Sequence, residues 1–136
     1  MGRLLRAVLL CVLVLWSAAP VEASYSPWLD GAELEFVDAV GSTGYYVDKK
    51  SISVANQDEC VARVMIVRAA DNRMYIYSTL FNRKVQTYQI FHTVVLQYDT
   101  KEELSVSERP MKPVGYMKGS PMYTIVEYIY EVPKNR

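Results

Sequence analysis

The stretch from Val85 to Tyr98 constrains the fold more than any other part of the chain, because its apolar and polar side chains alternate. The apolar members share one parity: Tyr88, Ile90, Val94, Leu96 and Tyr98. The polar members fall on the other parity: Thr87, Gln89, Thr93 and Gln97. A period of two is the pitch of a β-strand. The alternation therefore predicts a long strand with one apolar face, which needs paired neighbours and a cover over that face.

Other segments of strand-like composition supply the neighbours. They are residues 33–38, 45–47, 51–54, 60–69, 74–81 and 104–107, and clusters of turn-forming residues separate them. The turns are too closely spaced to leave room for crossover helices between parallel strands. The order of these segments therefore predicts an antiparallel meander of about six strands.

The end of the chain carries the pattern of a single helix. Ser120 is a residue type that caps helix amides, and Pro121 is tolerated at the first helical position. Apolar side chains then recur at the spacing of one helical stripe: Met122, Ile125, Val126 and Ile129. Pro133 ends the pattern after about three turns. Because so short a helix is unstable alone, we expect its stripe to dock on the apolar face of the sheet, which gives an α+β fold.

The first 23 residues have the features of an export signal. Arg3 and Arg6 precede an apolar run that ends before Pro20, and small residues stand at the cleavage position after Ala23. The run is shorter than the roughly 20 apolar residues that span a bilayer, and Cys11 lies inside it, not at its end as lipidation requires. We therefore expect a removed signal peptide at 1–23, no lipid anchor and no membrane span afterwards, and a single domain at 24–136.

The charge and cysteine content of this domain exclude several classes of protein. The whole chain has 15 basic and 15 acidic side chains. The signal removes Arg3, Arg6 and Glu22, so 13 basic and 14 acidic side chains remain and nucleic acid is not an expected partner. Cys60 is then the only cysteine, which excludes an intrachain disulfide and leaves a buried thiol or an intermolecular bridge as alternatives.

The sequence contains few groups that suggest catalysis. His92 is the single histidine, whereas zinc takes three or four protein ligands, so no metal site is predicted. Cys60 with His92 as its base is the only available nucleophilic pair, but nothing local lowers the pKa of the thiol. Phosphate loops, nucleophile elbows and zinc motifs are absent from the sequence. We therefore predict that the protein is not an enzyme and uses no cofactor.

Tyrosine is the unusual feature of the composition, with 11 residues that all follow the signal. Strands favour tyrosine, which explains many of them, but aromatic rings with a polar tip are also enriched at interfaces. Tyr75, Tyr77 and Phe81 share one parity of their strand, opposite Met74, Ile76 and Leu80: if the helix covers the second set, the first forms an aromatic patch. We take Tyr75, Tyr77 and Phe81 as the candidate partner-binding residues.

Three groups of residues, spread over most of the chain after the signal, resemble the surface-adhesin protein E-like domains, a family of small exported bacterial proteins. The groups are Tyr45 to Asp48 with Ser51 and Ile52, then Tyr88 to Ile90 with Tyr98 and Asp99, then Gly119 and Ser120 with Ile125, Tyr128 and Ile129. The resemblance implies a curved antiparallel sheet with the carboxy-terminal helix on its concave face. It also implies binding of host matrix and serum proteins, and dimerisation.

Two departures limit what the resemblance implies for this chain. It has no lipidation cysteine at the cleavage position, and its helix lacks the cysteine that can crosslink the helix to the sheet in family members. We expect a periplasmic or secreted protein that acts as an adhesin-like module, binding a protein partner through a sheet face or edge. The alternative is a periplasmic structural or envelope-associated protein, whose partner is itself or another envelope component.

Overall fold

The computed structural model describes residues 25–131, so the signal peptide expected at 1–23 lies outside the described residues. These residues form an antiparallel sheet with strand order β1-β2-β4-β5-β6-β7, while β3 pairs with β4 and β8 pairs with β6. The strands are β1 (Leu34–Val40), β2 (Thr43–Asp48), β3 (Ser53–Val54), β4 (Glu59–Arg68), β5 (Arg73–Asn82), β6 (Thr87–Gln97), β7 (Glu103–Ser107) and β8 (Val114–Gly115). Short 3-10 turns are η1 (Pro27–Leu29), η2 (Lys49–Ser51) and η3 (Ala69–Asp71), and the helix α2 is Pro121–Glu131.

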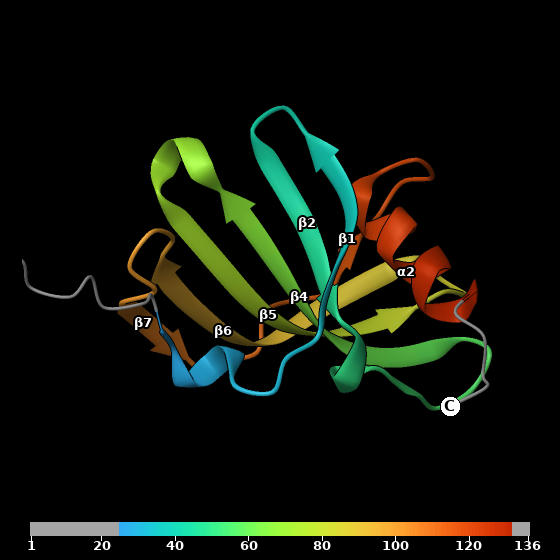
Figure 1. The fold of residues 1–136 in the computed structure, drawn as a ribbon. Coiled ribbons are helices and arrows are strands. Elements are labelled where there is room, and N and C mark those ends of the chain that lie inside the picture. The colour runs from blue at the N-terminus through green and yellow to red at the C-terminus, as the bar shows by residue number, and fades with distance from the viewer. Residues whose placement is uncertain (1–24, 132–136) are drawn as a thin grey trace, which may run out of the picture.

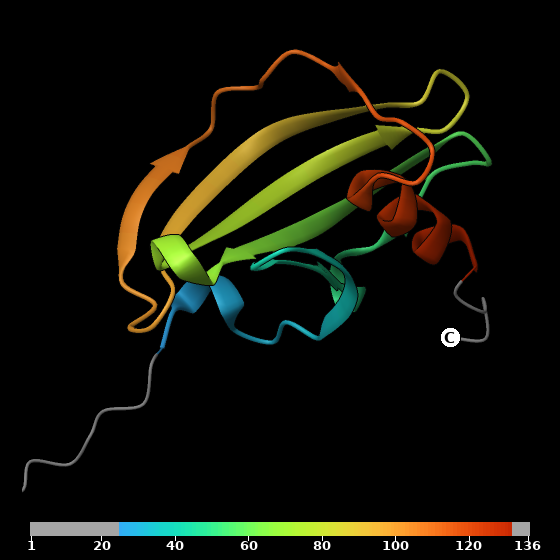
Figure 2. The same ribbon diagram turned by 90° about the horizontal axis from the view of Figure 1, so that it is seen from above.

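The sheet is strongly curved and is not closed into a barrel. Strands β4, β5 and β6 bend together, and α2 lies on their concave side (Figure 2). At one edge of the sheet β1 follows β2 and approaches α2, while β7 forms the other edge (Figure 1). The predicted α+β architecture, a curved antiparallel meander with one carboxy-terminal helix, is confirmed.

A β-bulge in β6 changes which face its side chains occupy. Ser78 of β5 pairs with His92, but the next residue, Thr79, pairs with Ile90, so Phe91 is an extra residue in β6. An extra residue shifts the alternation by one position. The expectation that Tyr88, Ile90, Val94, Leu96 and Tyr98 line one face is therefore wrong: Tyr88 packs on the concave side, whereas Val94 and Leu96 belong to the convex cluster described below.

The main core lies between the concave face and α2. It consists of Val47, Cys60, Ala62, Val64, Ile66, Phe81, Tyr116, Met122, Ile125, Val126 and Ile129. The four stripe residues predicted from helical spacing are all buried against the sheet. Since α2 is short, this burial is what keeps it helical.

A second cluster of buried side chains lies on the convex face, where β4, β5 and β6 carry Met65, Met74, Ile76, Val94 and Leu96. Trp28 and Leu29 of η1 pack over it. The Trp28 indole nitrogen donates to the Glu103 carboxylate at 2.6 Å, which fastens η1 toward the β7 edge. The central strands are therefore covered on the convex face and, where α2 packs, on the concave face as well.

The start of α2 has the predicted cap. The Ser120 hydroxyl oxygen accepts a hydrogen bond from the Tyr123 amide at 3.3 Å, and Pro121 is the first helical residue. Gly119 has a positive φ of 84°, which a residue with a Cβ adopts only with strain, and this turns the chain into the cap. Near the other end, Arg83 pairs with Glu127 at 3.7 Å and stacks on the Tyr130 ring, which ties α2 to the turn between β5 and β6.

Candidate functional site

The predicted aromatic patch divides into two parts in the structure. Tyr75 and Tyr77 are half-buried on the concave face and stack on each other, with ring centroids 5.8 Å apart and an angle of 18° between the planes. Phe81 is 0% exposed within the main core, so its place in a surface patch is a wrong prediction. The reason is that α2 covers the face carrying Tyr75, Tyr77 and Phe81, not the face carrying Met74 and Ile76.

Because α2 is short, it leaves part of the concave face uncovered, and a groove of about 470 Å³ lies there. Its floor consists of residues from four strands: Tyr45, Ile66, Arg68, Tyr77, Tyr88 and Ile90. The facing wall of the groove is formed by the segment that leads into α2 and by the first helical turn: Gly115, Tyr116, Met117, Ser120, Pro121 and Met122. A volume of roughly 300–1,000 Å³ and a mainly apolar, aromatic lining are typical of ligand-binding pockets.

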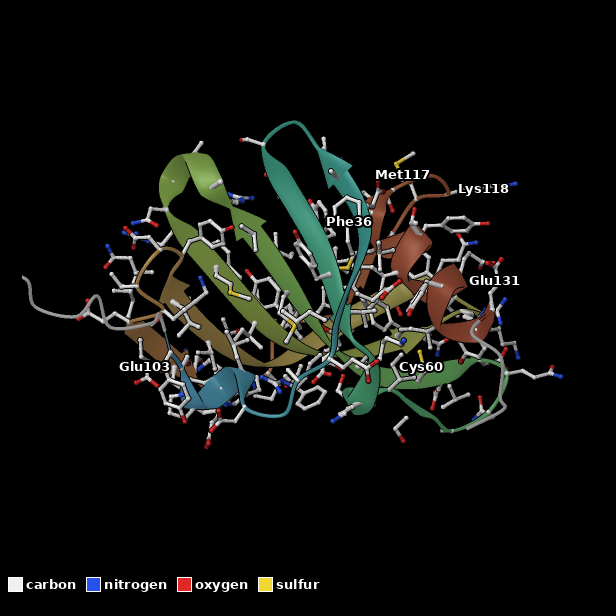
Figure 3. All side chains as sticks on the ribbon, in the orientation of Figure 1. Phe36, Cys60, Glu103, Met117, Lys118 and Glu131 are labelled. Carbon is white, nitrogen blue, oxygen red and sulfur yellow. The ribbon has the colours of Figure 1, made fainter. Side chains whose placement is uncertain are left out.

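Local contacts hold the segment between β8 and α2 over the sheet. The Tyr116 amide donates to the Gln86 carbonyl oxygen at 2.9 Å, and the Tyr116 ring packs against Tyr123 of α2 with centroids 6.4 Å apart. Tyr116 is consequently buried, while its neighbour Met117 is 79% exposed. Met117 and Lys118 project from this segment just before α2, at the end of the molecule opposite Glu103 (Figure 3). The groove therefore has one wall of sheet and one wall of loop.

Two of the phenol groups that line the groove, those of Tyr77 and Tyr116, have raised pKa values and are neutral at physiological pH. Burial is the main cause that raises the pKa of Tyr77, with smaller contributions from the neighbouring phenols of Tyr75 and Tyr88, while Arg68 opposes the shift. Burial also raises the pKa of Tyr116. A neutral phenol both donates and accepts hydrogen bonds. The groove thus offers ring faces to apolar groups and hydroxyls to polar ones.

The two residues considered as a catalytic pair lie on opposite faces of the sheet. Cys60 is 1% exposed in the main core under α2, whereas His92 faces the convex side, where its ring lies 5.4 Å from that of Trp28. Burial raises the pKa of the Cys60 thiol to about 11, although the Tyr130 hydroxyl and the Arg83 guanidinium oppose the shift. Cys60 is therefore a buried neutral thiol, and His92 cannot act as its base.

A second hollow, of about 410 Å³, lies where the turn before β4 meets the end of β5. Its lining is polar: Asn56, Gln57, Asp58, Glu59, Asn82 and Lys84. Part of this polarity serves the turn itself, since the Asn56 side chain accepts from the amides of Asp58 and Glu59. Within residues 25–131, no group of three or more histidine, cysteine or acidic side chains is arranged to hold a metal ion.

Sequence reasoning missed most of the groove. Tyr45 and Tyr88 were considered only as strand residues and as part of the family resemblance, and Tyr116 was not considered. The alternation gave Tyr88 a misleading signal, because it grouped Tyr88 with Leu96, whereas the pairing with Phe81 in the structure places Tyr88 on the face of the predicted patch. Tyr116 carried no signal, because it lies in a segment without regular periodicity.

Comparisons with protein-family models, with curated proteins and with solved structures found no match to this chain. Between residues 25 and 131, no helix has the length and apolar character needed to cross a membrane.

Proposed function

We propose that this chain is an exported, non-enzymatic binding module that binds a protein partner in the concave tyrosine-lined groove. The observation that carries the proposal is the groove itself, an open hollow on which four tyrosines converge from three strands and a loop. Among residues 25–131, its lining contains no cysteine, histidine or carboxylate, and its serine, Ser120, caps α2 with no base among the lining residues. The chemistry of the lining favours binding over catalysis.

The character of the tyrosines supports a protein partner. Tyrosine supplies a large, rigid contact area with a polar tip, and it is enriched among the residues that dominate binding energy at protein interfaces. Tyr75 stacks on Tyr77, which lines the groove, so the pair forms a stiff ledge beside the hollow. The exposed Met117 on the opposite wall adds a flexible apolar side chain, a residue type also enriched at interfaces.

The proposal agrees with the resemblance to surface-adhesin protein E-like domains. That resemblance implies a curved sheet with a carboxy-terminal helix on its concave side, and the chain has this architecture. Membership of the family and adhesin-like binding of matrix or serum proteins are part of the proposal. Export to the periplasm or the medium, without a lipid anchor, is also part of it.

The test is saturable binding of the purified protein to immobilised matrix and serum proteins, measured by surface plasmon resonance. The variant Tyr75→Ala/Tyr77→Ala removes the ledge, and we expect it to lose affinity by at least about 30-fold, the size of an interface hot spot. Tyr98→Ala is the matched control, since Tyr98 is an exposed tyrosine that does not line the groove. Wild-type binding by the double variant would remove the groove from consideration.

A structural role in the envelope is the second candidate, and the sheet edges favour it. All five residues of β7 are exposed, including Leu104 and Val106, and an open edge strand can pair with a second chain. This reading predicts a dimer that forms with rising concentration and no binding to host proteins. Sedimentation equilibrium of the protein, together with fractionation of the cells that produce it, distinguishes the two functions.

A further inference from the structure

The groove has an excess of positive charge at one end. Arg68 is the only charged side chain among the described residues that line it, and Arg68 stands directly opposite Arg73 of the neighbouring strand β5. Among the described residues, neither guanidinium forms an ion pair with a carboxylate: Arg68 contacts the Tyr75 ring at 5.8 Å, and Arg73 donates to main-chain carbonyl oxygens. Like charges directly opposite each other destabilise a sheet. An anion bound beside Arg68 would relieve this repulsion.

The remaining lining indicates which kind of anion fits. Ile66, Ile90 and Met122 provide apolar surface between the tyrosine rings. The phenol groups and the Ser120 hydroxyl provide hydrogen-bonding groups along the same walls. An acyl chain has no groups that could form hydrogen bonds with these hydroxyls. The amide groups of a peptide, in contrast, require hydrogen-bond partners when they leave water. The lining therefore fits a peptide that carries both an apolar side chain and a negative charge.

We propose that the groove binds the free carboxy-terminus of a partner protein, with the last side chain apolar and the terminal carboxylate at Arg68. The planar guanidinium can donate two parallel hydrogen bonds to a carboxylate, which gives direction as well as affinity. A chain end carries a carboxylate and an apolar side chain on the same residue, so it matches both Arg68 and the apolar surface of Ile66 and Ile90. This inference rests on the proposed function and specifies which part of the partner is bound.

The test uses acetylated peptides, Gly-Ser-Gly-Ser-Ala followed by Phe, Tyr, Leu, Ile, Val or Met, each made with a free carboxylate and as the amide. Binding to the purified protein is measured by isothermal titration calorimetry up to about 1 mM peptide, the weak end of measurable affinity. We expect at least one free acid to bind about tenfold or more tightly than its amide, the size of a hydrogen bond to a charged group.

Substitutions at Arg68 locate the effect. Arg68→Gln is expected to lower the affinity of the free acid to that of the amide. Arg68→Lys keeps the positive charge but cannot donate two parallel hydrogen bonds, so we expect an intermediate affinity. Arg109→Gln is the control, because Arg109 is an exposed arginine that does not line the groove, and it should change neither affinity. Far-ultraviolet circular dichroism and the urea midpoint of each variant establish that it is folded.

Three results would overturn the inference. Equal affinity for the free acid and the amide would show that the terminal carboxylate does not contribute to binding. A preference for the free acid that survives in Arg68→Gln would show that Arg68 does not bind the carboxylate. The absence of binding by every free acid, with Arg68-dependent binding of dodecanoate, would identify a small amphipathic carboxylate instead. If acid and amide bind equally, or if the preference survives in Arg68→Gln, the proposed function still stands provided that Tyr75→Ala/Tyr77→Ala abolishes partner binding. The proposed function itself fails if that double variant binds the partner normally.

Discussion

The substitution Ile125→Ala tests whether packing of α2 on the concave face stabilises the fold. Ile125 is 0% exposed in the main core, among residues of the sheet such as Val64 and Phe81. The change removes three buried carbons, each worth about 0.8 kcal/mol, which gives roughly 2.5 kcal/mol in transfer free energy. The cavity left behind raises the cost toward about 4 kcal/mol, and the better helix propensity of alanine returns a few tenths. We expect a net loss of about 2–4 kcal/mol.

The measurement is urea denaturation followed by far-ultraviolet circular dichroism. The midpoint should fall while the slope with urea stays constant, because the surface exposed on unfolding hardly changes. Val85→Ala is the matched control: Val85 is 62% exposed in the turn between β5 and β6, and a surface change of this kind alters stability by about 0.5 kcal/mol or less. A loss for Ile125→Ala no larger than for the control would refute the claim that α2 is docked on the sheet.

Two further predictions concern groups away from the groove. The Asp48 side chain is 5% exposed, accepts hydrogen bonds from the amides of Glu33 and Lys50, and pairs with Arg63 at 3.5 Å. Asp48→Ala should therefore cost about 2–3 kcal/mol of unfolding free energy by urea denaturation, and a loss as small as that of exposed Asp71→Ala would contradict this. Burial raises the pKa of Cys60 from 9.0 to about 11, so its thiol stabilises the fold fully below pH 9 and less as the pH approaches 11. Wild-type stability should fall more steeply over that interval than that of Cys60→Ala, and equal slopes would contradict the prediction.

Local patterns were sufficient to predict the longer strands and the helix, but not the short strand β8 or the faces of the sheet. The helix was found because Ser120, Pro121 and the apolar stripe act within a few residues of one another. The long strand was also found, yet its faces were assigned wrongly beyond the bulge. The alternation is interrupted at Phe91 and His92, but only the pairing with β5 identifies Phe91 as the extra residue. That single residue places Tyr88 and Leu96 on opposite sides of the sheet.

The groove was beyond prediction from sequence for a related reason. It depends on how far a helix of 11 residues reaches across a curved sheet, and on where the segment around Tyr116 is held. Both are properties of the assembled structure. Tyr75 and Tyr77 were identified because they alternate along one strand, whereas Tyr45 and Tyr116 come together with them only after the chain folds.

Because β4, β5 and β6 are packed on both sides, the groove has walls of unequal stiffness. Amides in these strands are shielded by the main core on one side and by the cluster under Trp28 on the other, so they should be among the slowest in the protein to exchange with solvent. The facing wall around Met117 and Lys118 is exposed and is not part of the sheet. The groove can therefore widen or narrow by movement of the loop wall while the sheet floor keeps its shape. Partners of different size can then be accommodated without loss of the fold.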